Sequence, residues 1–351
     1  MALTRRDKIL KLIVDHFIKT AQPVGSKTLI EEYGIPFSSA TIRNEMQALE
    51  NEGYLEKTHT SSGRVPSSKG YRYYIDHLRK QEVDEDLKYQ LQTILTEKTK
   101  SIEDIIKESC EVLTEMTHLA SVVLGPDAKQ EKLVSIQLIP ISDKTATAVF
   151  VTDQGYVENK TFVFEKSIAP NDIEKCVQLL NDRLKGTEIS SLLEKMEVLR
   201  PLLSDYVKEH DIIYQAIAQA LLKMARDRVV LYGQSNLFEQ PEFAEDAEKL
   251  KKMISFLENH DNLRSLELDE NGLSIRIGNA SEELEDVSVI QTSIEIPGRQ
   301  GGSIALVGPT RMDYDRVVSA LEYVAAALKE YFNKEESGEV DGRRENQEKD
   351  S

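Results

Sequence analysis

The chain has 351 residues, of which 40% are hydrophobic and 30% charged. This is the composition of a globular protein, and the length suffices for two or three domains. No run of about 18 apolar residues is present, which excludes a transmembrane helix, and the polar N-terminus is unlike a signal peptide. The two cysteines, Cys110 and Cys176, lie too far apart for a CxxC metal site. We therefore expect a cytoplasmic protein with no membrane partner and no disulfide framework.

Charge is distributed unevenly along the chain, whose formal net charge is −17. Residues 1–80 hold 13 Lys and Arg against 9 Asp and Glu, a balance of +4, so the remaining residues carry −21. A basic N-terminal region on an acidic body suggests a dedicated anion-binding module, although chance variation of the surface produces the same asymmetry.

The N-terminal region is predicted to contain three helices. Apolar residues recur at helical spacing over residues 4–19, and a turn containing Pro and Gly ends that helix. Ser26 is a good N-cap for a short second helix. Ser38 or Ser39 caps a third helix over residues 40–51.

The third helix has an apolar stripe and a polar outward face. The stripe is formed by Ile42, Met46 and Leu49. The outward face is formed by Ala40, Arg43, Asn44, Gln47 and Asn51. Arginine pairs with guanine in the major groove, and Asn or Gln pairs with adenine. The small residues Ser39, Ala40 and Thr41 allow close approach to base edges and phosphates. A solvated helix face has the same polar composition, so this pattern alone does not decide between the two interpretations.

The residues after the third helix favour the nucleic-acid interpretation. Residues 54–58 predict a short strand, and residues 59–70 form a polar loop that holds Arg64 beside a glycine. Three helices followed by a hairpin with a basic tip are typical of a winged helix. We expect the third helix to enter the major groove of double-stranded DNA and Arg64 to reach the adjacent minor groove. Lys69 is expected to join the DNA contacts.

Five stretches of the chain closely resemble the hallmark sequences of the bacterial HrcA family of heat-inducible transcription repressors. They are residues 23–29 (PVGSKTL), 38–46 (SSATIRNEM), 60–74 (TSSGRVPSSKGYRYY), 296–302 (IPGRQGG) and 308–314 (GPTRMDY). Their order and spacing also match, and the resemblance covers about residues 1–335. It is much more specific than a generic helix-turn-helix pattern.

Beyond residue 80 the periodicity predicts both helices and strands. The predicted helices are 81–100, 102–116, 171–184, 189–196, 202–224, 245–257 and 315–332. The predicted strands are 120–124, 133–139, 145–151, 157–164, 229–232, 273–277, 287–295 and 303–307. The second to fourth of these strands form an antiparallel meander, and the other five are expected to form one antiparallel sheet flanked by helices.

The predicted fold class is therefore α+β, with one sheet domain interrupted by an insertion. The resemblance implies the same division, in which a GAF-like domain contains an inserted dimerisation domain. The expected domains are a winged-helix DNA-binding domain (1–80), a connector helix with the first part of the GAF-like domain (81–130), an inserted α+β dimerisation domain (131–225), the second part of the GAF-like domain (226–335) and a disordered tail (336–351).

One helix of the insertion has an apolar face wider than a single core-facing stripe. Such a face suggests a second partner, which here would be another copy of the chain in a homodimer. The candidate interface residues are Ile212, Ile213, Ile217 and Leu221. The alternative interpretation is a helix buried within its own domain.

Enzymatic function is not expected. The six histidines show no HExxH or paired metal-binding spacing, and the chain has neither GxSxG nor a P-loop. Cys110 and Cys176 lie on apolar stripes and are expected to be buried and inert. We expect no metal, no cofactor and no catalytic residue.

The resemblance implies a dimeric repressor of heat-shock chaperone genes. Its DNA partner would be CIRCE, an inverted-repeat operator, and its protein partner the chaperonin GroEL, which maintains its activity. One alternative is a regulator whose GAF-like domain senses a metabolite. Another is a winged-helix scaffold that binds a protein instead of DNA.

Overall fold

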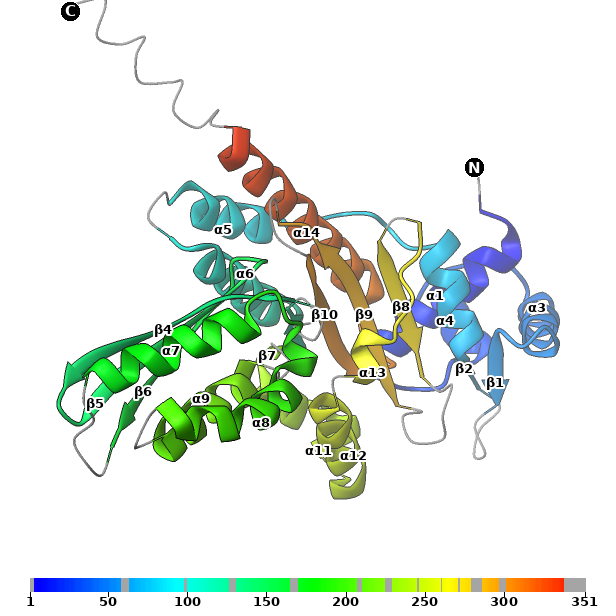
Figure 1. Ribbon diagram of the computed structural model, residues 1–351. Helices are drawn as coiled ribbons and strands as arrows, with labels where there is room; N and C mark the ends of the chain where they lie inside the picture. The colour runs from blue at the N-terminus through cyan, green and yellow to red at the C-terminus, as the bar shows by residue number, and fades with distance from the viewer. Residues whose placement is uncertain are drawn as a thin grey trace, which may run out of the picture. The chain divides into compact units, whose positions relative to one another are not determined.

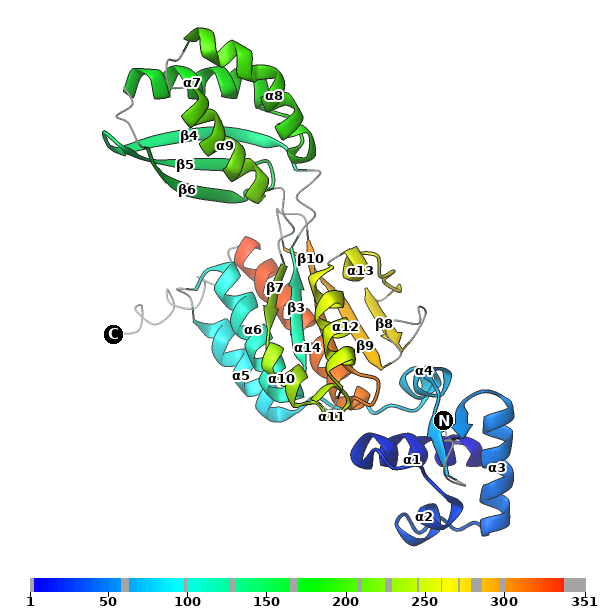
Figure 2. The same ribbon diagram turned by 90° about the horizontal axis from the view of Figure 1, so that it is seen from below.

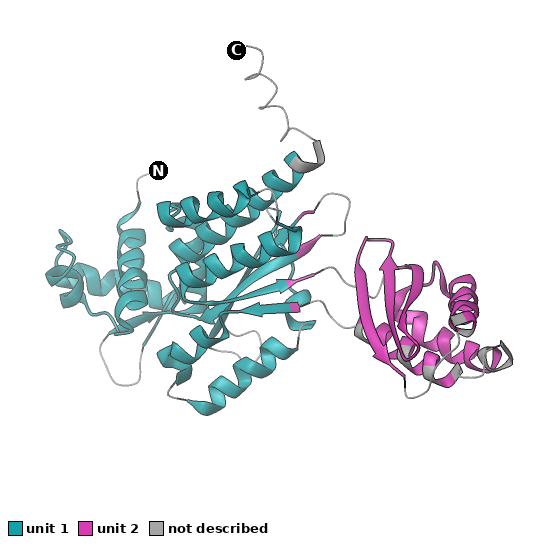
Figure 3. Cartoon of the chain, turned by 90° about the vertical axis from the view of Figure 1, so that its left-hand side faces the viewer, with its two compact units in different colours: residues 1–123, 230–294, 303–351 teal, residues 124–229, 295–302 magenta. Residues whose placement is uncertain are grey.

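The computed structural model divides the chain into two compact units (Figure 3). Unit 1 comprises Met1–Val123, Val230–Ile294 and Ser303–Ser351, and unit 2 comprises Leu124–Val229 and Glu295–Gly302. The described residues are 3–57, 63–97, 100–125, 131–164, 170–206, 210–224, 229–244, 246–259, 261–270, 272–278, 286–296 and 301–337. The tip of the predicted hairpin and the predicted disordered tail beyond residue 337 lie outside them.

Unit 1 begins with three helices that contact one another; the first and third are labelled in Figure 1, and all three in Figure 2. They are α1 (Arg5–Thr20), α2 (Ser26–Glu31) and α3 (Ser39–Asn51). A capping box starts α1, because Thr4 Oγ1 accepts from the Asp7 amide while the Asp7 carboxylate accepts from the Thr4 amide. Ser38 caps α3, since its Oγ accepts from the Thr41 amide at 3.1 Å. The predicted Ser26 cap is wrong, because Gly25 occupies the N-cap position of α2.

A two-stranded hairpin follows the three helices. Strand β1 (Leu55–Lys57) pairs antiparallel with β2 (Arg64–Pro66), and Val24 forms an isolated bridge with Arg64 on the other side of β2. A Cβ atom at Gly63 would lie 2.8 Å from Pro23 Cβ, so only glycine allows this approach. The bridge attaches the hairpin to the segment between α1 and α2.

The rest of unit 1 is built around a five-stranded sheet. Its strand order is β7-β3-β10-β9-β8, and Figure 2 shows helices on both of its faces. The strands are β3 (Ala120–Leu124), β7 (Val229–Tyr232), β8 (Leu273–Ile277), β9 (Val287–Ile294) and β10 (Gly302–Pro309). All five strands were predicted from the sequence, and so was their assembly into one sheet.

The helices of this region include several that the sequence did not predict. They are α4 (Ser68–His77), α5 (Glu85–Thr96), α6 (Ile102–Thr117), α10 (Gln234–Glu239), α11 (Pro241–Ala244), α12 (Ala247–Glu258), α13 (Asp261–Arg264) and α14 (Tyr314–Ser337). The predicted helices correspond to α5, α6, α12 and α14. Three of the others, α10, α11 and α13, have no more than six residues, too few for a periodic signal.

Unit 2 consists of a three-stranded sheet with helices packed on one face. The strands are β4 (Leu133–Ser142), β5 (Thr145–Thr152) and β6 (Val157–Val163), and the helices are α7 (Pro170–Leu184), α8 (Ile189–Tyr206) and α9 (His210–Met224). The sheet is an antiparallel meander in the order β4-β5-β6, as predicted. The helix α8 continues through Pro201 to Tyr206, beyond its predicted end at residue 196.

The boundaries of the units differ from those expected from the sequence. Unit 2 begins at Leu124 and its main segment ends at Val229, whereas the sequence places the insertion at 131–225. It also includes Glu295–Gly302, which the sequence assigns to the second part of the GAF-like domain. Strand β3, which precedes the insertion, is flanked in the sheet by β7 and β10, which follow it.

Candidate nucleic-acid interface

The helix α3 buries one face and exposes another. Ile42, Met46 and Leu49 are buried. The exposed side chains are Ala40, Arg43, Asn44, Gln47 and Asn51. The predicted outward face of α3 is therefore confirmed as an exposed face. It presents hydrogen-bond donors and acceptors of the types that pair with base edges in the major groove.

The hydroxyl groups at the start of α3 form local hydrogen bonds. Ser39 Oγ lies 3.0 Å from Ser26 Oγ, and Thr41 Oγ1 lies 2.9 Å from Ser38 Oγ. Both Ser39 and Thr41 are half-buried, while Ala40 between them is exposed. These bonds fix the first turn of the helix, and contact of this turn with phosphates stays a prediction.

The side chain of Arg43 is attached to the neighbouring helix. Its Nε donates to Ser26 Oγ at 3.2 Å, and Ser26 is buried. The hydroxyl group that the sequence predicts as a helix cap therefore contacts a predicted base-reading side chain instead. No feature of the sequence pattern pointed to this contact, because Ser26 and Arg43 lie on different helices.

Arg64 does not occupy the position predicted for it. Its side chain is buried, and both Nε and Nη2 contact Glu50 Oε2, at 2.7 and 2.6 Å. Nη2 also donates to Gln47 Oε1 at 3.4 Å. The prediction that Arg64 extends into the minor groove is corrected: its charge is paired with Glu50, and it holds strand β2 against α3.

Lys69 also interacts with the end of α3. Its Nζ donates to the carbonyl oxygen of Glu52 at 2.8 Å and lies 4.6 Å from the centre of the Tyr54 ring. A cation at this carbonyl stabilises the C-terminus of a helix. Lys69 is exposed, so its contact with DNA stays a prediction.

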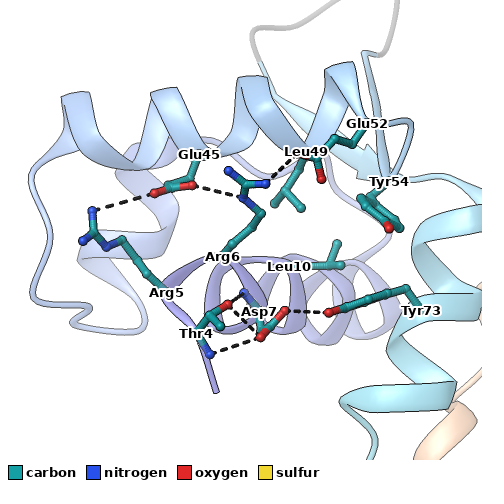
Figure 4. A pocket seen from close by; sticks show the side chains of 10 residues that line it. All are labelled: Thr4, Arg5, Arg6, Asp7, Leu10, Glu45, Leu49, Glu52, Tyr54 and Tyr73. Carbon is teal, nitrogen blue, oxygen red and sulfur yellow. Dashed lines mark hydrogen bonds and ion pairs between the residues drawn. The ribbon is translucent and has the colours of Figure 1, made fainter. Parts of the chain in front are cut away.

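Two basic residues of α1 are paired with Glu45 of α3 and with Glu52, the C-cap residue of that helix. Both line a cleft between these helices with a volume of about 470 Å³, and Figure 4 shows their side chains. Arg6 contacts Glu45 at 3.3 Å and Glu52 at 2.5 Å, while Arg5 contacts Glu45 at 3.7 Å. The hydrogen bond to Glu45 and the charge of Glu52 raise the pKa of Arg6. Part of the positive charge of residues 1–80 is therefore neutralised by ion pairs within the same region.

The predicted dimer-interface residues lie in the core of unit 2. Ile213 and Ile217 are 0% exposed and Leu221 is 1% exposed, all within one cluster with residues of α7, α8 and the sheet. The side chain of Ile212 lies outside the described part of the chain. The interface prediction is corrected for the other three residues, because side chains buried within their own chain are not accessible to a partner. The alternative interpretation, a helix buried in its own domain, is the one observed.

The outer face of the unit 2 sheet is uncharged. Cross-strand pairing places residues of the three strands together on this face, and Ile139, Val157 and Val163 are exposed there. The face consists of Ser135, Gln137, Ile139, Thr145, Thr147, Val149, Val151, Val157, Asn159, Thr161 and Val163. In the sequence these residues alternate with the buried Ala146, Ala148 and Phe150. This alternation indicates that the sheet has a second, outward face.

Comparison with known proteins gives consistent matches along the chain. A family profile described as the HrcA protein C-terminal domain matches residues 103–318. The heat-inducible transcription repressor HrcA of Lysinibacillus sphaericus is 40% identical over 96% of this chain and 100% of its own. The HrcA of Bacillus pumilus is 40% identical over 93% of this chain and 97% of its own. The chain belongs to the HrcA family.

A solved structure of similar fold is known. A crystal structure of a hypothetical protein at 2.2 Å resolution covers 95% of this chain and 99% of its own, with 26% identity and a TM-score of 0.67. Membership of the HrcA family makes the chain a heat-inducible transcription repressor and not an enzyme.

The cysteines of this HrcA-family chain are buried, as predicted. Burial raises the pKa of both the Cys110 and the Cys176 thiol to about 12. Such thiols stay protonated at neutral pH and are poor nucleophiles. Within the described residues, no helix is long and apolar enough to cross a membrane, and no group of three His, Cys, Asp or Glu is arranged to hold a metal ion.

The Glu50 carboxylate generates a prediction about acid stability. Burial raises its pKa, but hydrogen bonds from Lys57 and Arg64 outweigh this effect and the pKa ends below its usual value of 4.5. A lowered pKa stabilises the folded state above pH 4.5, and the stabilisation is lost as the pH falls through the folded pKa. We expect Glu50→Gln to unfold more easily at neutral pH and to lose less stability between pH 5 and pH 3 (roughly the range of carboxylate titration).

Urea unfolding of the full-length chain at several pH values, followed by tyrosine fluorescence, measures this dependence. Glu56→Gln is the matched control, since Glu56 is an exposed carboxylate on the same hairpin. Parallel pH profiles for Glu50→Gln and the wild type would show that the ion pair does not contribute.

Proposed function

We propose that the protein represses chaperone operons by binding the inverted-repeat operator CIRCE as a homodimer. The N-terminal region acts as a winged helix in which α3 enters the major groove. The exposed face of α3 carries this proposal, because Arg43, Asn44 and Gln47 together present the groups that read guanine and adenine. The order of three helices and an antiparallel hairpin supports it.

The hairpin contributes to the proposed interface chiefly through its attachment to α3. The Glu50–Arg64 contact and the Val24–Arg64 bridge fix β2 against the helices. In this arrangement the hairpin supports the DNA-binding surface. We therefore assign Arg64 to positioning the hairpin and not to a DNA contact of its own.

The remaining part of unit 1 is inferred to be GAF-like, with unit 2 as the inserted dimerisation domain. An inverted repeat requires two DNA-binding regions related by a two-fold axis. We assign the dimer contact to the uncharged outer face of the unit 2 sheet. Because the chain carries a net charge of −17, two copies repel each other, and an uncharged face is where this repulsion costs least. Depletion of charge is also typical of interface cores.

GroEL is the proposed protein partner. Strand β3 lies between β7 and β10 in the sheet, although more than 100 residues separate β3 from β7 in sequence. Such pairing across a long insertion slows folding and exposes apolar edges before it is complete. A repressor that folds in this way depends on a chaperonin, and unfolded proteins produced by heat compete with it.

The first expected outcome concerns base recognition. Arg43→Ala, Asn44→Ala and Gln47→Ala should each weaken operator binding by about 1–3 kcal/mol, because each removes a contact to a base edge. Fluorescence anisotropy with operator and with random duplex DNA measures specific and non-specific affinity. Lys107→Ala, which removes an exposed cation from α6, is the control and should bind as the wild type does. Wild-type affinity in all three α3 variants would exclude this face as the reader.

The second expected outcome concerns the dimer. Ile139→Lys combined with Val163→Lys should produce monomers that bind the operator weakly, because burying two unpaired charges at an interface is costly. Both side chains are exposed, at 46% and 79%, so the unit should still fold. Sedimentation equilibrium measures the oligomeric state. Val198→Lys, at a residue of α8 that is 70% exposed, is the matched control and should remain dimeric. A dimeric double variant would place the interface elsewhere.

The third expected outcome concerns the chaperonin. The purified protein should bind the operator better when GroEL and ATP are added, because the folded fraction increases. Addition of an unfolded competitor protein should reverse the gain. Operator affinity that is the same with and without GroEL across the heat-shock temperature range would contradict this part of the proposal.

A further inference from the structure

We propose that Ser26 is a positioning residue that orients Arg43 for base recognition. Ser26 lies on α2 and does not face the DNA surface, because its side chain is buried with a residual exposure of 6%. The proposal rests on the function proposed above, in which Arg43 on α3 reads a base. It adds a residue that determines sequence preference without touching the DNA.

The hydroxyl group of Ser26 is available for this role because it does not cap its own helix. Serine at a helix start normally accepts from a backbone amide two or three residues ahead. Here Ser26 is the first residue of α2, and Gly25 occupies the N-cap position without a side-chain bond. The Ser26 hydroxyl instead lies 3.2 Å from Arg43 Nε and 3.0 Å from Ser39 Oγ.

The geometry of these two bonds defines the orientation of the Arg43 guanidinium. A serine hydroxyl has one donor hydrogen and two acceptor lone pairs, so Ser26 can accept from Arg43 while sharing its second bond with Ser39. The Ser39 bond in turn prevents the Ser26 hydroxyl from rotating away. Among the residues that the structure describes, Arg43 is thus held through Nε.

Holding Nε leaves the base-reading edge of the guanidinium unoccupied. The two terminal nitrogens of Arg43 form no hydrogen bond to any residue that the structure describes, and the side chain is exposed. Guanine is recognised by a pair of parallel N–H donors aimed at O6 and N7. An arginine without this restraint samples many rotamers and loses that freedom on binding. Ser26 reduces this loss and favours one orientation of the donor pair.

The experiment compares base preference in five full-length proteins: wild type, Ser26→Ala, Ser26→Thr, Arg43→Ala and the double variant of Ser26→Ala with Arg43→Ala. The probe is an inverted-repeat duplex selected from a random library by the wild-type protein, together with duplexes that replace each base pair of one half-site in turn. Competition binding gives the preference at each position. Failure of the wild type to select any inverted repeat would contradict the proposed function itself, before Ser26 is tested.

We expect Ser26→Ala to reduce the preference for guanine by about three- to tenfold at one position, the effect of one hydrogen bond. Arg43→Ala should reduce the preference for guanine at the same position. The preference of the double variant should be no lower than that of Arg43→Ala. The salt dependence of binding should not change in Ser26→Ala, because the number of neutralised phosphates is the same. Ser26→Thr, which keeps the hydroxyl group, should restore the wild-type preference.

A purely structural role for Ser26 gives a different result. It would lower affinity for all duplexes in proportion to the loss of folded protein, which thermal unfolding measures on the same samples. An unchanged preference profile in Ser26→Ala, or a further loss in the double variant, would overturn the proposal. The proposal would also be overturned if Ser26→Thr showed as weak a preference for guanine as Ser26→Ala, since the hydroxyl group would then not be the source of the preference.

Discussion

The rotation of α3 about its own axis determines which side chains the N-terminal region exposes. Burial of Ile42, Met46 and Leu49 fixes this rotation, because exposing any of them would cost hydrophobic free energy. With these three residues inward, Arg43 and Gln47 must face outward. Each element around the helix then contacts a different side of it.

The contacts around α3 follow from this single orientation. Glu45 and Glu52 face α1, where they pair with Arg6, and Glu50 faces the hairpin, where it pairs with Arg64. The helix is thus held by charged contacts on two sides and by apolar packing. Its exposed face carries the neutral and basic groups that remain, and these are the groups suited to base edges.

The sequence predicted most of the fold, because long periodic segments contain their own signal. The strands of both sheets and the long helices α1, α3, α6 and α14 were predicted close to their observed bounds. The helices α10, α11 and α13 were missed because six residues or fewer do not complete two turns, whereas the six-residue α2 was predicted from the turn residues on either side of it. The exposed face of α3 was also predictable, since three buried positions define the helix orientation.

The site contacts were predicted less well, for two physical reasons. The pairing of Arg64 with Glu50 depends on their proximity in the fold, which the sequence does not give. A basic residue beside a glycine is the same sequence pattern whether its side chain binds a phosphate or a carboxylate. The wide apolar face of α9 indicated burial, but periodicity does not distinguish burial within one chain from burial between two. Ile213 and Ile217 are buried within one chain, and the uncharged sheet face was overlooked because its residues come from three strands.

The most direct test of the account is to locate α3 on DNA. A nuclease-active iron chelate attached through a maleimide at Asn51→Cys would cleave the DNA closest to the exposed face of the helix. Cys110 and Cys176 are buried with pKa values near 12, so the label attaches at the new cysteine alone. We expect two groups of cuts in the major groove, one in each half of the inverted repeat and symmetric about its centre. Cuts that are absent, or no different from those of a chelate attached at Val198→Cys in α8, would contradict it.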